Sequence, residues 1–176
     1  MDIFIEQIVK RDKRPIDYIK LVLLLFGAVV FMYLAVYSAG FIGWIGTILF
    51  FACAAIVYLI YRAIIGLNVE FEYCLTNGSF DVDKIIAKRS RKHIITLNAR
   101  EIEIFAPKSD RSFKRHMDDS HIKKIYACTS INDEDVAFIV FSDNETQNML
   151  LFNPNKKIKD AFRRLNPQKV MFNDED

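Results

Sequence analysis

The densest group of chemically active side chains is the basic segment Lys88–His93, with the sequence KRSRKH. Four cations occupy five consecutive positions in a chain whose formal net charge is only +2, and they are Lys88, Arg89, Arg91 and Lys92. Such a cluster can bind the phosphates of lipid headgroups or nucleic acid, it can contact a partner protein, or it can be a solvated turn. No aromatic platform accompanies it, and residues 67–176 hold 18 basic and 18 acidic residues. Nucleic acid is therefore not expected as a partner.

The three histidines do not have the spacing of a zinc site, in which two imidazoles stand four positions apart on a helix beside a glutamate. His116 and His121 lie in a polar stretch with Asp118 and Asp119, which is a weak pattern for metal binding. We interpret this stretch as a solvated loop and expect no metal site.

Asp81 and Asp83 are a candidate pair of catalytic carboxylates, because alternate residues of a strand share one face. They alternate with Phe80 and Val82, so they are expected on the solvent side. The chain also lacks a glycine-rich phosphate loop and a nucleophile elbow. We therefore expect no enzymatic activity, no cofactor and no small-molecule substrate.

The first structural feature that positions these residues is a long apolar run. Residues 21–61 contain no Asp, Glu, Lys, Arg or His. An uncharged run longer than about 18 residues is typical of a membrane span, and a single helix of this length would reach about 60 Å. We predict a transmembrane hairpin at 16–65, with helices at about 18–37 and 41–63 and a break at Ser38–Gly40. The run is too long for a signal peptide.

Basic residues flank the outer ends of this hairpin, with four of them within residues 10–14 and Arg62 near the other end. The turn between the helices has none, which favours a two-span protein with both termini in the cytoplasm. Because the thiols outside the membrane would then meet a reducing compartment, all three cysteines are expected to be free.

Residues 1–15 are expected to form a short helix on the inner membrane surface. Ile5, Ile8 and Val9 recur at helical spacing beside a basic end. A frayed polar leader is equally compatible with this pattern.

The sequence pattern of residues 66–166 predicts a cytoplasmic domain of seven antiparallel strands and a final helix. Apolar and polar residues alternate along 68–76, and Asn77–Gly78 is a strong hairpin signal, because both central positions of a type I′ turn need a positive φ. The return strand is 79–87. Five further strands are expected, at 93–97, 101–105, 122–129, 136–142 and 147–152.

The last predicted element is an amphipathic helix at about 155–165, with Asn153 as its cap and Pro154 in its first turn. An apolar stripe lies opposite a basic face composed of Lys156, Lys157, Lys159, Arg163 and Arg164. Asn166 and Pro167 end the helix, and the acidic tail at 167–176 is expected to be flexible.

Seven strands followed by one helix is the element order of the pleckstrin-homology (PH) superfold. A further resemblance is carried by the double span and by three segments, which are FIEQIVKR, NVEFEYCLTNGSFDVDKIIAKRSRKHI and LLFNPNKKIKDAF. The chain resembles a family of small bacterial two-span membrane proteins with a cytoplasmic PH-like domain of unknown function. The resemblance implies a membrane-anchored PH-like module in a bacterial plasma membrane and no particular activity. Phosphoinositide-binding PH domains hold headgroups around a longer first hairpin loop, whereas the first predicted hairpin here is the tight Asn77–Gly78 turn.

An antiparallel order would return the basic segment to the membrane end of the sheet, because the first two strands run about eight residues out and about nine back. The same order places 107–120 at the membrane end and Asp133–Asp135 at the far end. The predicted membrane-surface contact therefore comprises Lys88, Arg89, Arg91, Lys92, Lys114 and Arg115.

The leading hypothesis is a non-enzymatic, membrane-anchored interaction or scaffold module whose partners are the lipid bilayer and a protein that the sequence does not identify. One alternative is a module that senses anionic headgroups or the membrane surface. A third alternative is an accessory subunit of a transporter or an enzyme. It is the weakest of the three, because the spans contain no ionisable residue that could couple to a substrate.

Overall fold

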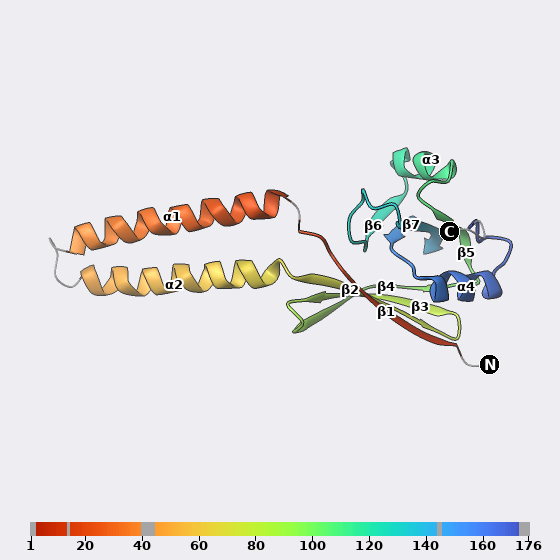
Figure 1. Cartoon of the computed structure of the whole chain (residues 1–176), viewed down its shortest axis with the longest axis horizontal. Coiled ribbons are helices and arrows are strands. Elements are labelled where there is room, and N and C mark those ends of the chain that lie inside the picture. The colour runs from red at the N-terminus through yellow and green to blue at the C-terminus, as the bar shows by residue number, and fades with distance from the viewer. Residues whose placement is uncertain (1–2, 14, 40–44, 144–145, 173–176) are drawn as a thin grey trace. The chain divides into compact units, whose positions relative to one another are not determined.

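The structure is a computed structural model of the 176-residue chain, and it describes residues 3–13, 15–39, 45–143 and 146–172. The chain forms two compact units. Residues 13–68 form a helical unit, and residues 1–12 fold together with residues 69–176 into what we call the sheet unit. The helical unit is thus an insertion into the chain of the sheet unit (Figure 1).

The helical unit contains α1 (Pro15–Ala39) and α2 (Ile45–Gly66), which lie side by side (Figure 1). Residues 15–37 have a mean hydropathy of 2.5 and are long and apolar enough to cross a membrane. Residues 51–66 form a shorter apolar helix. Helix α1 continues through Ser38 and Ala39, while Gly40, the third residue of the predicted break, lies outside the described residues.

The first sheet of the sheet unit has the order β1-β2-β3-β4, with every neighbouring pair antiparallel. Its strands are β1 (Phe4–Lys10), β2 (Val69–Thr76), β3 (Ser79–Ile86) and β4 (Ser90–Asn98). The N-terminal interfacial helix predicted for residues 1–15 is therefore wrong, because residues 4–10 form an edge strand.

Strand β1 forms because the free edge of β2 supplies hydrogen-bond partners that an isolated short helix lacks. Its register runs from Phe4 opposite Thr76 to Lys10 opposite Glu70. The segment also alternates with a period of two, and Ile5 and Val9 pack against the core. A short apolar run of this kind fits both the helical period of 3.6 and the strand period of two. Pairing with a distant strand decides between helix and strand.

The remaining strands form a second sheet with the order β5-β7-β8-β6, so within the described residues eight strands in two sheets replace the predicted seven antiparallel strands, and one pairing is parallel. Its strands are β5 (Ile102–Pro107), β6 (Lys123–Tyr126), β7 (Ala137–Asp143) and β8 (Thr146–Phe152). Strand β6 is parallel to β8. A parallel pair needs a crossover connection. Residues 108–122, which contain the short helix α3 (Ser112–Asp118), provide it.

Helix α4 (Lys156–Leu165) packs on the core through Ile158, Ala161 and Phe162, as its apolar stripe predicted. Its N-cap is Asn155, whose side chain accepts a hydrogen bond from the Ile158 amide at 2.9 Å. The predicted cap, Asn153, instead accepts a hydrogen bond from the Thr129 amide at 2.8 Å. The cap therefore lies two residues later than predicted, because the Asn153 side chain is hydrogen-bonded to Thr129 and Asp133 instead of to the helix.

Aromatic side chains from both sheets and α4 form the centre of the core. The ring centroids of Phe80 and Phe152 are 5.3 Å apart, and those of Phe105 and Phe162 are 4.9 Å apart. The segment after α4 joins this core, since Val170 bridges to Phe105 and the Phe172 ring lies 4.8 Å from the Phe105 ring. The flexible tail predicted from residue 167 is thus wrong up to residue 172, and residues 173–176 lie outside the described residues.

Candidate functional site

The basic segment begins in the turn between β3 and β4. Ile86 and Ser90 are paired, and the Arg89 amide donates to the Ile86 carbonyl at 3.1 Å. The two central residues, Ala87 and Lys88, have φ angles of 57° and 55°. This left-handed conformation is disfavoured by about 1–2 kcal/mol per residue for residues with a Cβ atom. The turn therefore presents the exposed side chains of Lys88 and Arg89 on a backbone that their sequence does not favour.

This turn lies at the end of the first sheet from which the chain leaves for the helical unit and to which it returns. Ile86 is opposite Val69, the first residue of β2, and Glu70 is opposite Lys10, the last residue of β1. Strand β2 begins three residues after α2 ends at Gly66. The predicted return of the basic segment to this end of the sheet is confirmed by the pairing.

Arg91, a predicted membrane contact, faces carboxylates on the outer surface of the first sheet. Its Nη2 atom lies 2.5 Å from Oε2 of Glu72, and its Nε atom lies 3.9 Å from Oδ2 of Asp83. The contact with Glu72 is an ion pair without an aligned hydrogen bond, because the same Oε2 atom has no hydrogen-bond partner. Arg91 is therefore engaged within the sheet.

Glu72 is 7% exposed, and burial raises the pKa of its carboxyl group. Arg91 opposes this shift, whereas a hydrogen bond with the Glu6 side chain raises the pKa further. The Glu72 carboxylate thus depends on Arg91 for its charge to be tolerated at this position.

Lys92 points to the opposite surface of the sheet, where it is paired directly with Lys84 of β3. Lys84 is in turn opposite Phe71, a buried core residue, so both lysines lie on the surface that elsewhere faces the core. Lys84 was not among the predicted site residues. The signal was present, because Lys84 continues the alternation of Phe80 and Val82 and so places a charge in the core-facing series.

Lys114 and Arg115 lie on α3, which follows β5 of the second sheet. Figure 1 draws α3 at the opposite side of the sheet unit from the tip of the β3–β4 hairpin. The structure therefore does not bring these two residues together with Lys88 and Arg89.

The predicted division into a basic end and an acidic end is also wrong. The Lys108 amide donates to the Val136 carbonyl at 2.9 Å, and its Nζ atom donates to the Ile131 carbonyl at 2.6 Å. Residues 107–111 and the loop with Asp133–Asp135 thus lie at the same end of the second sheet. The crossover through α3 is the reason, because it returns the chain to the end where β5 began before β6 starts.

Asp81 and Asp83 belong to a polar row on the outer surface of the first sheet. Nδ1 of His93 lies 2.8 Å from Oδ1 of Asp83, and its Nε2 atom lies 3.2 Å from Oγ1 of Thr96. The Thr96 hydroxyl donates to Asp81. These residues form a hydrogen-bonded chain across β3 and β4 on an exposed sheet face, as predicted for the two aspartates.

The other two histidines lie apart from this row. His116 is on α3, where its Nδ1 atom lies 2.8 Å from the Ser112 carbonyl oxygen, so residues 112–118 are helical rather than the predicted loop. Within the described residues, no three His, Cys, Asp or Glu side chains group as metal ligands.

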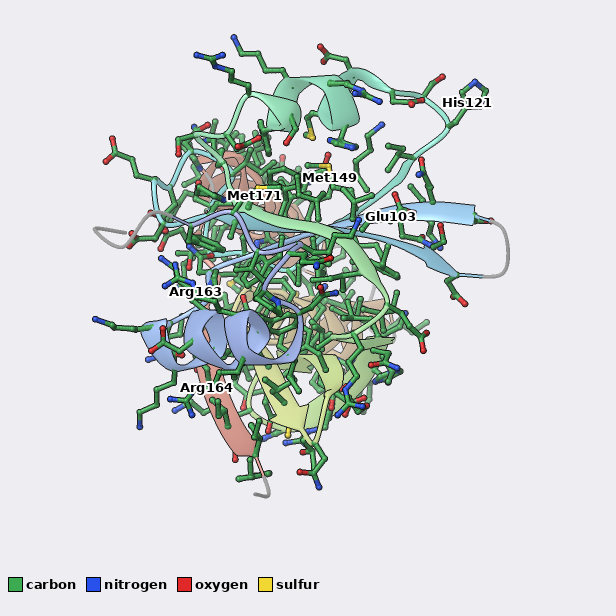
Figure 2. All side chains as sticks on the ribbon, turned by 90° about the vertical axis from the view of Figure 1, so that its right-hand side faces the viewer. Glu103, His121, Met149, Arg163, Arg164 and Met171 are labelled. Carbon is green, nitrogen blue, oxygen red and sulfur yellow. The ribbon has the colours of Figure 1, made fainter. Side chains whose placement is uncertain are left out.

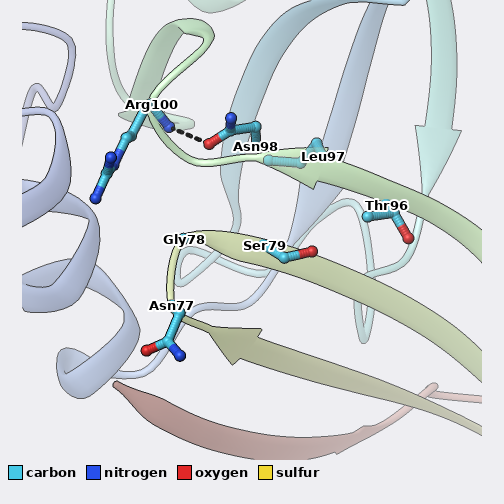
Figure 3. Close-up of a pocket in the computed structure, with 7 residues that line it drawn as sticks. All are labelled: Asn77, Gly78, Ser79, Thr96, Leu97, Asn98 and Arg100. Atoms are coloured by element: carbon cyan, nitrogen blue, oxygen red, sulfur yellow. Dashed lines mark hydrogen bonds between the residues drawn. The ribbon is translucent and has the colours of Figure 1, made fainter. Parts of the chain in front are cut away.

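One open hollow of about 310 Å³ lies at the other end of the first sheet (Figure 3). It is lined by Asn77, Gly78, Ser79, Thr96, Leu97, Asn98 and Arg100. Two of its polar side chains are used internally: Oδ1 of Asn98 accepts from the Arg100 amide at 3.1 Å, and Oδ1 of Asn77 accepts from the Ile3 amide at 3.0 Å. The hollow is a product of the two turns that border it.

The basic face of α4 is partly occupied by the segment that follows it. Nη2 of Arg163 donates to the Phe172 carbonyl at 2.9 Å, and Nζ of Lys159 lies 4.7 Å from the centre of the Phe172 ring. Figure 2 shows Arg163 and Arg164 on this helix. Arg164 is exposed.

Two packed four-stranded sheets closed by a C-terminal helix, with an apolar helix of membrane-spanning length, place the chain in the class of small α+β domains with a PH-like fold. The chain belongs to a family described as a bacterial PH-like domain of unknown function, whose profile matches residues 1–172. The match includes β1 and both apolar helices. No curated protein and no solved structure matches the chain.

The tight Asn77–Gly78 turn is the second hairpin of this PH-like fold rather than the first. The connection between the first two strands is residues 11–68, which contain both apolar helices. The predicted contrast was between the Asn77–Gly78 turn and the first hairpin loop of phosphoinositide-binding PH domains. That comparison used the wrong connection, because β1 was not recognised as a strand.

Proposed function

We propose that this protein is a non-enzymatic interaction module anchored in the bacterial plasma membrane by two spans, with both termini in the cytoplasm. The observation that carries the proposal is strand β1, which precedes the apolar helices in sequence and pairs over seven residues with β2, which follows them. A sheet cannot form across a bilayer, so the chain must return to the side from which it entered. If α1 crosses the membrane, α2 must cross it as well.

Short connections support this anchoring. The Asp12 amide donates to the Thr129 carbonyl at 3.0 Å, so only residues 13 and 14 lie between this contact with the sheet unit and the start of α1. On the return side only Leu67 and Asn68 separate α2 from β2. The basic residues at 10–14 and Arg62 favour the cytoplasm for the ends of the hairpin that adjoin the sheet.

Strand β1 also supports an interaction role. It is an edge strand, and its outward side chains Phe4 and Ile8 are 67% and 54% exposed. Exposed apolar side chains on an unpaired edge are features of surfaces that bind another polypeptide. The proposed partner is a protein at the same membrane face.

The interaction role is tested by placing a photo-crosslinking amino acid at position 4 or 8 of the full chain in native membranes. We expect a cross-linked product with a second protein. Position 171 is the matched control, since Met171 is an apolar residue that is 52% exposed after α4. Equal products at all three positions, or none together with purification of the protein alone from several mild detergents, would contradict the proposal.

The anchoring is tested separately with cysteine-reactive reagents that do not cross membranes. Cysteines introduced near both termini are expected to react only when the cytoplasmic face is exposed. Reaction of the two termini from opposite faces would show that the chain crosses the membrane once.

A second candidate function, contact with anionic membrane surfaces, is favoured by one observation. The turn that carries Lys88 and Arg89 lies beside the two points where the chain connects to its apolar helices. Each basic residue near an anionic leaflet contributes about 1 kcal/mol of attraction.

A further inference from the structure

Two lysines in the β3–β4 hairpin are paired in a way that disfavours the folded state. Lys84 and Lys92 are directly opposite each other, and directly opposed residues of antiparallel strands have Cβ atoms about 4.5–5.5 Å apart. Like charges at this spacing repel. Within the described part of the chain, neither ammonium group has a carboxylate within salt-bridge distance or a hydrogen-bond acceptor.

The rest of the hairpin shows that this repulsion is local. On the outer surface, the basic residues of β4 have acidic neighbours: Arg91 contacts Glu72, and His93 contacts Asp83. The cations on the other surface have no such neighbour and therefore can take a counter-ion from outside the chain.

The tip of the same hairpin supplies a second, independent observation. Ala87 and Lys88 are consecutive residues with side chains in the left-handed region. The turn holds the cationic residues Lys88 and Arg89 next to the end of the strands that carry Lys84 and Lys92. Residues with side chains in such sparsely populated backbone conformations cluster at active sites and ligand-binding sites.

We propose that Lys84 and Lys92, with Lys88 and Arg89 at the tip, form a binding site for the phosphate group of anionic lipid headgroups. A phosphate between two ammonium groups accepts a charge-assisted hydrogen bond from each and replaces their repulsion by attraction. Free phosphate has the same chemistry. The lipid is the occupant because this end of the sheet adjoins both connections to the apolar helices, and in this respect the site rests on the proposed membrane anchoring.

The experiment is amide hydrogen exchange of the full chain in lipid nanodiscs, followed over peptides that cover residues 84–92. Discs of phosphatidylcholine alone are compared with discs that contain about 30% phosphatidylglycerol at low salt. We expect exchange in this hairpin to slow about tenfold in the anionic discs and to recover at high salt, because the contact is electrostatic.

Two variants and a control identify the residues. Lys84→Gln/Lys92→Gln is expected to lose most of the protection, and Arg89→Gln to lose part of it and to serve if the double variant does not fold. Lys114→Gln/Arg115→Gln removes two charges from α3 and is expected to keep the full protection.

Three results would overturn the site. They are equal exchange in neutral and anionic discs, full protection in the Lys84→Gln/Lys92→Gln variant, and protection by inorganic phosphate in neutral discs that matches protection by the lipid. The last result would identify a site for soluble phosphate. Failure of the membrane anchoring is recognised separately, because the chain would then not enter the discs at all.

Discussion

The first sheet contains two turns that each hold two consecutive residues with positive φ angles but are built from very different residues. Asn77 and Gly78, between β2 and β3, have φ angles of 50° and 102°, and Ala87 and Lys88, between β3 and β4, have φ angles of 57° and 55°. Asparagine and glycine are the residues that this conformation prefers, whereas alanine and lysine are not. The first turn therefore stabilises the hairpin that it closes, and the second is maintained by the strands on either side of it.

The difference indicates where the molecule departs from what stability alone would select. The departure coincides with an opposed lysine pair and with the end of the sheet at which the chain connects to the apolar helices. Conflicts between local preference and fold are expected at functional sites. The following predictions test whether the two turns differ in this way.

The largest effect is expected at the favourable turn. Gly78→Val places a branched side chain at a φ of 102° and should lower the free energy of unfolding by about 1–3 kcal/mol. Urea denaturation of the full chain in mild detergent measures the change. A loss no larger than that of an exposed strand substitution such as Thr76→Val would show that this turn does not determine the stability of the hairpin.

The next effect concerns Arg91, which belongs to the basic segment but faces acidic partners. Arg91→Gln should lower the free energy of unfolding by about 1–2 kcal/mol at neutral pH, because the buried Glu72 carboxylate loses its cation. Arg89→Gln, which changes an arginine two residues earlier in the turn, is the matched control and should have no measurable effect in detergent. Equal effects of the two substitutions would contradict the assignment of Arg91 to the sheet.

The Arg91 effect should depend on pH in a defined direction. The pKa of Glu72 is raised above its ordinary value of 4.5, so the folded state binds this proton more tightly than the unfolded chain does. The contribution of Glu72 to stability is therefore greatest below pH 4.5 and is lost as pH rises through the raised pKa. Arg91→Gln should approach the parent protein at low pH and diverge from it toward neutral pH. A difference that grows on acidification would contradict this account.

A smaller effect of opposite sign is expected at the strained turn. Ala87→Gly should raise the free energy of unfolding by about 0.5–1 kcal/mol, because glycine adopts a positive φ without a Cβ clash. The measurement is the same denaturation experiment, with Ala99→Gly as a control that should destabilise, since Ala99 is buried. Destabilisation by Ala87→Gly would show that the turn is not strained.

The smallest effect is expected at the lysine pair. Lys92→Gln should raise the free energy of unfolding by about 0.3–0.5 kcal/mol in a neutral detergent at low salt, because it removes the repulsion with Lys84. The gain should disappear at high salt. A loss of stability at low salt would show that Lys92 has a stabilising partner.

Features with a local signal could be predicted from the sequence, whereas pairings between distant strands could not. Asn77–Gly78 was predicted because its signal is local, and so was the apolar stripe of α4. Strand β1 was not predicted, because its partner β2 lies about 60 residues away and its short apolar pattern fits a helix as well. The position of β6 could not be derived either, since a parallel pairing leaves no mark in a single short strand.

The candidate site was predicted only in part for the same reason. Charge density identified Lys88, Arg89 and Lys92, but it also selected Arg91, whose acidic partners come from β2 and β3. Lys84 was missed because it is a single charge in an ordinary strand. Its significance depends on the residue opposite to it, which only the register of β3 and β4 defines.

The pairing of β1 with β2 is the central claim, because both the anchoring and the position of the basic turn depend on it. Glu6 is directly opposite the native thiol of Cys74, so Glu6→Cys should form a disulfide with Cys74 on mild oxidation of intact membranes. Ile5→Cys, whose side chain points to the other surface of the sheet, should not. Formation of the disulfide by Glu6→Cys alone is the predicted result, and its absence, or equal yields from the two variants, would contradict the account.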